Sequence, residues 1–203
     1  ASSWLKCHHP AAFTAALLNS QPMGFYAPAQ LVTDARQHHV EVRPVDVSHS
    51  QWDCTLEKNE QNNAALRLGF RTVAGLSEEI TDRIIHVRDQ RSYDSFDDFK
   101  QRVRLGAANL SRLSRADAFR SINLSRRPAL WESLPDQSRQ PLFENLNETD
   151  TPATLPRMSE FSQIIADYRA TGMSLKGHPL QSFRRHFEQQ GIVTAGSLKN
   201  HEP

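Results

Sequence analysis

The amino-acid sequence predicts a mainly α-helical protein with a small antiparallel β element, an α+β fold. Apolar residues recur at helical spacing before residue 40 and again after residue 77. Between these regions the period of the apolar residues changes from about 3.6 to about 2, as in half-buried strands. At 203 residues the chain is long enough to bury a core, as one large domain or two small ones.

The first 39 residues are expected to form helices. Pro10 stands at a plausible first helical position, and Phe13, Leu17 and Leu18 share one face of the helix that follows. Residues 21–26 break this pattern with a short apolar loop. Pro28 then begins another helix.

Three runs of alternating apolar and polar residues predict a small sheet of two or three strands, at residues 40–43, 52–56 and 66–71. The polar loop at residues 58–63 suits a connection between antiparallel strands. Pro44 confines its strand to an edge or an end, because proline cannot donate to a strand ladder.

After Gly75 the chain is expected to be helical again. Ser77 can cap a helix that runs to about Arg91, and Ser95 can cap another that ends near Val103. Further helices are expected at residues 108–119, after Ser125, at residues 161–168 and at residues 180–187. Four prolines make residues 135–157 an extended linker.

The turn at Gly75, Leu76 and Ser77, followed by an amphipathic helix, has the pattern of a helix-hairpin-helix element. Its main-chain N–H groups would bind a nucleic-acid phosphate, because the first N–H groups of a helix lack partners and the helix dipole is positive there. The alternative is a plain capped helix. Ser77 replaces the usual second glycine, and Glu78 and Glu79 oppose a nearby anion.

A second hairpin is expected at residues 109–119, which would make the element tandem. It lacks the glycine but lies in a block, residues 100–127, that holds eight basic residues and one acidic residue. Arg112, Arg115 and Arg120 are the candidates for contacts with a polyanion. The alternative is a helical pair that packs its apolar side chains into the core.

No catalytic or metal-binding pattern is found. The adjacent Cys7, His8 and His9 lack the spacing of a closed zinc site, and the acids at 94, 97 and 98 stand where a helix begins. We therefore expect no metal, no cofactor and no active site. Two distant cysteines and the lack of a membrane-spanning or signal segment favour a cytoplasmic protein.

A short apolar peptide at residues 139–143 interrupts an acidic region. Gln140, Leu142 and Phe143 could dock into a groove of a partner, or Phe143 could fold back onto its own domain.

Together these segments resemble the C-family bacterial DNA polymerases, the family of the polymerase III alpha subunit, and most closely their error-prone branch. The resemblance rests on residues 3–13, 17–26 and 42–47, and on Ala116-Asp117-Ala118-Phe119 and Gly177-His178-Pro179. It covers essentially the whole chain. Because the sequence does not begin with methionine, we expect a piece of a longer polymerase.

The resemblance implies four regions. Residues 1–48 would be the end of the fingers domain, and 49–134 the β element with tandem helix-hairpin-helix. Residues 135–157 would be a linker with a clamp-binding peptide, and 158–203 a helical pair leading toward an oligonucleotide-binding fold. The catalytic palm would lie outside, so that Mg²⁺ is expected only for the parent polymerase, a damage-induced translesion enzyme.

The expected function is therefore sequence-independent binding of duplex DNA. A competing hypothesis is a protein-interaction module that docks the sliding clamp or a damage-response accessory protein through residues 139–143 and the Phe25-Tyr26 loop. A third is the same region of a replicative alpha subunit. In relatives the clamp peptide usually begins with glutamine, whereas here Arg139 holds that place and Gln140 follows one position late.

Overall fold

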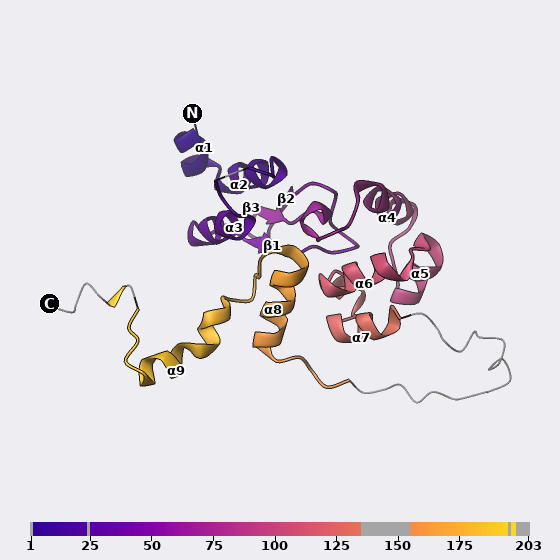
Figure 1. Ribbon diagram of the computed structural model, residues 1–203. Helices are drawn as coiled ribbons and strands as arrows, with labels where there is room; N and C mark the ends of the chain where they lie inside the picture. The colour runs from indigo at the N-terminus through magenta and orange to yellow at the C-terminus, as the bar shows by residue number, and fades with distance from the viewer. Residues whose placement is uncertain (1, 24, 135–154, 195, 198–203) are drawn as a thin grey trace.

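The computed structural model describes residues 2–23, 25–134, 155–194 and 196–197. The N-terminal helices are α1 (Ser2–His8), α2 (Pro10–Asn19) and α3 (Pro28–Gln37) (Figure 1). As expected, Pro10 and Pro28 occupy the first positions of their helices. Helix α2 packs against two strands of the sheet and α3 against the third.

The sheet has the order β1-β3-β2 and mixed direction. Strands β2 (Thr55–Lys58) and β3 (Ala64–Arg67) form the expected antiparallel hairpin, whereas β1 (Val42–Arg43) pairs with β3 in parallel. The expectation of a purely antiparallel element is therefore wrong for β1. Alternation of apolar residues predicts which face is buried, but it carries no information on strand direction.

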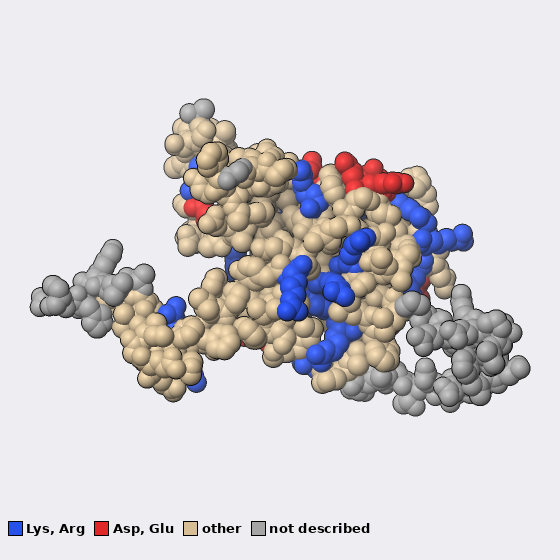
Figure 2. Space-filling model, in the orientation of Figure 1, with Lys and Arg blue, Asp and Glu red and all other residues tan. Residues whose placement is uncertain are grey.

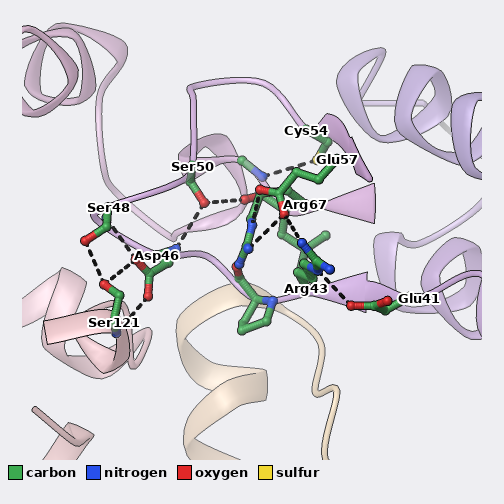
Figure 3. Close-up of polar contacts among 12 residues, drawn as sticks. Glu41, Arg43, Asp46, Ser48, Ser50, Cys54, Glu57, Arg67 and Ser121 are labelled. Carbon is green, nitrogen blue, oxygen red and sulfur yellow. Dashed lines mark hydrogen bonds and ion pairs between the residues drawn. The ribbon is translucent and has the colours of Figure 1, made fainter. Parts of the chain in front are cut away.

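An ion-pair network ties the three strands together. Glu57 accepts hydrogen bonds from Arg67 Nε (2.7 Å) and from Arg43 Nη1 (2.6 Å), which lie on either side of it in Figure 3. These guanidinium groups, Arg67 foremost, lower the pKa of the Glu57 carboxyl to about 2. The side chain of Arg67 also donates to the carbonyl oxygen of Pro44, so it holds the end of β1 against β3.

A helical region follows the sheet, at the right of Figure 1. It contains the short 3₁₀ turns η1 (Phe70–Thr72) and η2 (Arg120–Ile122), and the helices α4 (Glu78–Gln90), α5 (Phe96–Val103), α6 (Ala107–Arg115) and α7 (Arg126–Glu132). Ser77 and Ser95 cap α4 and α5 as predicted, through hydrogen bonds of 3.4 and 3.1 Å. Ser125 precedes α7, but its side chain makes no capping bond.

The core of this region is aromatic. Phe99 and Phe119 are fully buried, and their ring centroids lie 5.1 Å apart in an edge-to-face arrangement. Phe96 packs against Phe119 in the same way, at 4.8 Å. The α5 helix is therefore fixed against the end of α6.

Helix α8 (Glu160–Thr171) returns to this region and packs against α6. The main-chain N–H of Ala74 donates to the carbonyl oxygen of Ala170 (2.8 Å), and buried Arg126 pairs with Asp167. The chain then continues into η4 (Pro179–Phe183) and α9 (Arg184–Gln189), which are largely exposed. Helix α8 is thus a structural part of the helical region.

Candidate nucleic-acid interface

The predicted hairpin at Gly75 is present and open. Gly75 has a φ of 75°, in the left-handed region that favours glycine. Leu76 is buried and anchors the turn, while Gly75 and Ser77 on either side are exposed. The turn therefore projects from the protein on a fixed apolar base.

The main chain of this hairpin offers unused donors. Within the described residues, no hydrogen bond uses the N–H group of Gly75 or of Ser77, whereas the intervening Leu76 donates to Val73. These N–H groups lie at the positive end of the α4 dipole, where an anion is stabilised. Glu78 and Glu79 are exposed in the first turn of α4, so an anion would have to approach from the Gly75 side.

Arg112 of α6 lies over the Gly75 turn. A Cβ atom placed on Gly75 would be only 3.0 Å from Nε of Arg112, so glycine is what allows the guanidinium to approach the main chain so closely. The side chain of Arg112 is held from the other end by Asn109 Oδ1, at 2.6 Å. The hairpin and α6 therefore combine a positive side chain with free main-chain N–H groups.

The second hairpin is not where the sequence pattern placed it. Residues 107–115 form one continuous helix, so the expected hairpin at residues 109–119 is wrong. The second turn precedes α6, at Arg104, Leu105 and Gly106. Arg104 has a φ of 54°, Leu105 is buried, and Gly106 is the N-cap of α6.

Each residue of this turn has a counterpart in the first hairpin. Left-handed Gly75, buried Leu76 and N-cap Ser77 correspond to Arg104, Leu105 and Gly106, with a constant offset of 29 positions (75 and 104, 76 and 105, 77 and 106). Within the described residues, the N–H groups of Leu105 and Gly106 also take part in no hydrogen bond. A tandem element is therefore present, with its second turn closer to α5 than expected.

Two arginines cross between the hairpins. Arg83 follows the N-cap of α4 by six positions, and its Nη2 donates to the carbonyl oxygen of Arg104 (3.1 Å). Arg112 follows the N-cap of α6 by six positions and lies over Gly75. Each helix thus begins at one hairpin and reaches the other with an arginine, which gives the pair an approximate two-fold symmetry.

The turn after α6 is buried and has a structural role. Asp117, with a φ of 61°, is only 7% exposed, and it pairs with Arg120 Nε (2.6 Å). Asp46 covers the same turn, because its carboxylate accepts hydrogen bonds from the N–H and the hydroxyl of Ser121, as Figure 3 shows. Of the predicted basic residues, Arg120 therefore has its charge partly neutralised within the protein.

Arg112 and Arg115 remain available. Neither belongs to an ion pair among the described residues, and Arg115 is exposed one turn after Arg112 on α6. Figure 2 shows that lysine and arginine side chains gather over α6, α7 and α8, while acidic side chains gather over α4. The surface is therefore positive on the α6 side of the Gly75 turn and acidic on the α4 side.

Other predicted features lie elsewhere or are absent from the described part of the chain. Gln140, Leu142 and Phe143 fall outside the described residues. Among the residues described, no three or more His, Cys, Asp or Glu side chains are arranged to hold a metal ion. In the same residues, no helix is long and apolar enough to span a membrane.

The two hairpins define a helix-hairpin-helix protein. In agreement, residues 39–129 match a sequence family described as a helix-hairpin-helix motif, which suggests binding of DNA. The match includes both turns, the three helices α4, α5 and α6, and the first part of α7.

Relatives identify the family. The chain is 48% identical over 204 residues to an error-prone DNA polymerase of Brucella abortus, covering 98% of this chain and 19% of the relative. It is 43% identical to that of Methylococcus capsulatus and 44% identical to that of Alkalilimnicola ehrlichii, in both cases over 97% of this chain. The chain belongs to the error-prone DNA polymerase family and spans about a fifth of the length of these relatives.

Proposed function

We propose that this region binds duplex DNA through its sugar-phosphate backbones, as the part of an error-prone DNA polymerase that holds the duplex without reading its sequence. The observation that carries the proposal is the open turn at Gly75 beneath the guanidinium of Arg112. Main-chain N–H groups and arginine contact phosphates of any sequence, so they give affinity and position but no specificity.

The approximate two-fold symmetry of the hairpins supports a duplex over a single strand. The two backbones of a duplex run antiparallel, and two equivalent turns would meet one backbone each. Arg104 would add a positive charge at the second turn. Gly75 cannot supply one at the first turn, where Arg112 is present instead.

The relatives' name adds the wider role. We infer that the whole protein transfers nucleotides during error-prone DNA synthesis, with Mg²⁺ at carboxylates that lie outside this region. The described residues do not fit such a metal site, since no acidic cluster is arranged to hold an ion. Contacts of Gln140, Leu142 and Phe143 with a sliding clamp or an accessory protein stay a prediction.

A fluorescence titration of a labelled duplex tests the proposal. Arg112→Ala is expected to weaken binding about two- to five-fold, the range of one exposed charge contact. The slope of log K against log salt should become shallower by about one. Arg36→Ala, an exposed arginine on α3, is the matched control and should change neither quantity.

Two results would contradict the proposal. One is wild-type affinity for duplex DNA that does not respond to salt. The other is an Arg112→Ala variant that binds with the wild-type affinity and salt slope, because the Gly75 turn would then not be the phosphate site.

A further inference from the structure

Helix α8 lies beside the first hairpin, although it falls outside residues 39–129, which match the helix-hairpin-helix family. The hydrogen bond from Ala74 N–H to the Ala170 carbonyl (2.8 Å) joins the end of α8 to the residue before Gly75. This contact brings the last turn of α8, which includes the main chain of Arg169, close to the first hairpin.

Arg169 and Arg115 face a common hollow from two helices. Both line a cavity of about 380 Å³ between α6, α7 and α8, whose floor is formed by apolar side chains that include Leu130, Phe161 and Ile165. Both arginines are exposed, and neither belongs to an ion pair within the part of the chain that the structure describes. Among the residues that the structure describes, no aspartate or glutamate lines this cavity.

Polar contacts of a buried side chain fix the position of α8. Asp167, two residues before Arg169, is buried and pairs with Arg126 at the start of α7 and with Lys176 Nζ (3.0 Å). Its Oδ2 also accepts the hydroxyl proton of Ser174 (2.7 Å). Arg169 therefore extends from a rigid helix, so that a contact with a ligand costs the ordering of one side chain only.

The arginines follow one another at a spacing that suits a phosphate backbone. Arg112 and Arg115 are three residues apart on α6, which separates them by about 4.5 Å along the helix axis. Phosphates of one DNA strand advance by about 3.4 Å along the duplex axis. Arg112 and Arg115 are therefore close enough on one helix to contact nearby phosphates of a single strand, with Arg169 across the cavity from Arg115.

We propose that α8 extends the DNA-binding surface, and that Arg169 with Arg115 binds the backbone phosphates of the strand held at Gly75. This inference rests on the proposed function and adds a site outside the helix-hairpin-helix element. The apolar floor would also suit an acidic peptide with leucine or phenylalanine side chains. Continuity with Arg112 and the Gly75 turn favours DNA.

The test is the same duplex titration at several salt concentrations, on the whole chain. Arg169→Ala should weaken binding about two- to five-fold and make the salt slope shallower by about one, as for a single lost phosphate contact. Arg169→Lys keeps the charge and should retain most of the slope. Arg185→Ala, an exposed arginine on α9, serves as the control and should leave both unchanged.

The outcomes separate this inference from the proposed function. If Arg112→Ala weakens binding but Arg169→Ala changes neither affinity nor slope, α8 is outside the DNA surface and only this inference fails. Loss of affinity with an unchanged slope would mean that Arg169 acts through folding, which also overturns it. So would binding of a Glu- and Leu-rich peptide that is lost in Arg169→Ala while duplex affinity stays the same.

Discussion

Arg83 and Arg112 hold equivalent positions in the two hairpins, and each contacts the turn of the other. Arg83 Nη2 donates to the Arg104 carbonyl oxygen at 3.1 Å, and Arg112 lies within close contact of Gly75. The two turns are therefore held in register by side chains that also carry charge. Substitution of either arginine should therefore alter the opposite hairpin.

Gly75→Ala should destabilise the first hairpin in two ways, through an unfavourable main-chain conformation and through a close contact with Arg112. Its φ of 75° is unfavourable for alanine by about 1–2 kcal/mol, and the new Cβ would lie 3.0 Å from Arg112 Nε. Urea unfolding should show the loss in the free energy of unfolding, and the titration should show weaker duplex binding. Gly191→Ala is the control, because Gly191 has a φ of 74° with no neighbour within 4 Å; a similar loss of DNA binding there would refute the contact argument.

The Arg104→Gly variant is expected to be more stable than the Arg104→Ala variant. Both changes remove the charge, but alanine keeps the cost of a left-handed residue, about 1 kcal/mol. The free energies of unfolding of Arg104→Gly and Arg104→Ala should differ by this amount in urea titrations. Equal stabilities would show that the turn at residues 104–106 relaxes when the arginine is removed.

Arg126→Met should be strongly destabilising. It leaves the buried Asp167 and the buried Asp117 without one of their cationic partners, and breaking a buried pair in this way costs about 3–5 kcal/mol. Combining it with Asp167→Leu should recover part of the loss, because the uncompensated carboxylate is then gone. A double-mutant cycle measured by chemical unfolding checks this; strictly additive losses would contradict a direct interaction.

Acid should weaken the sheet through Glu57. Its pKa is about 2 in the folded protein against 4.5 for an unperturbed glutamate, because Arg67 and Arg43 stabilise the charged form. A lowered pKa contributes stability above pH 4.5, and this contribution is lost as the pH falls toward 2. Glu57→Gln should therefore flatten the fall in the urea midpoint between pH 5 and pH 2.5, whereas exposed Glu60→Gln should follow the wild type.

Each feature that the sequence predicts correctly depends on a residue type with one main structural role. Gly75 indicated a left-handed turn because few other residues adopt one, and Ser77 and Ser95 indicated helix starts because their hydroxyls accept main-chain hydrogen bonds. The second hairpin could not be predicted in this way, because its left-handed residue is an arginine and not a glycine. Arg104 is in the left-handed region, Leu105 after it is buried, and Arg83 donates to the Arg104 carbonyl oxygen; the local sequence pattern predicts none of the three.

A signal for the second hairpin was nevertheless present. Leu76 and Leu105 each precede an N-cap residue, and Arg83 and Arg112 recur at the same offset. A search for weak self-similarity would have aligned them. Long-range contacts have no such signal, since nothing near Asp46 predicts its hydrogen bonds to Ser121, and nothing near Ala170 predicts that its carbonyl oxygen accepts from Ala74.

Leu134, two residues after α7, and Leu155, before α8, together line a second cavity, of about 410 Å³. These two leucines are thus close together in space, and α8 is secured by Asp167 and Ala170. The placement of α8 against the hairpins is therefore set by these contacts, whatever number of residues separates the two leucines along the sequence.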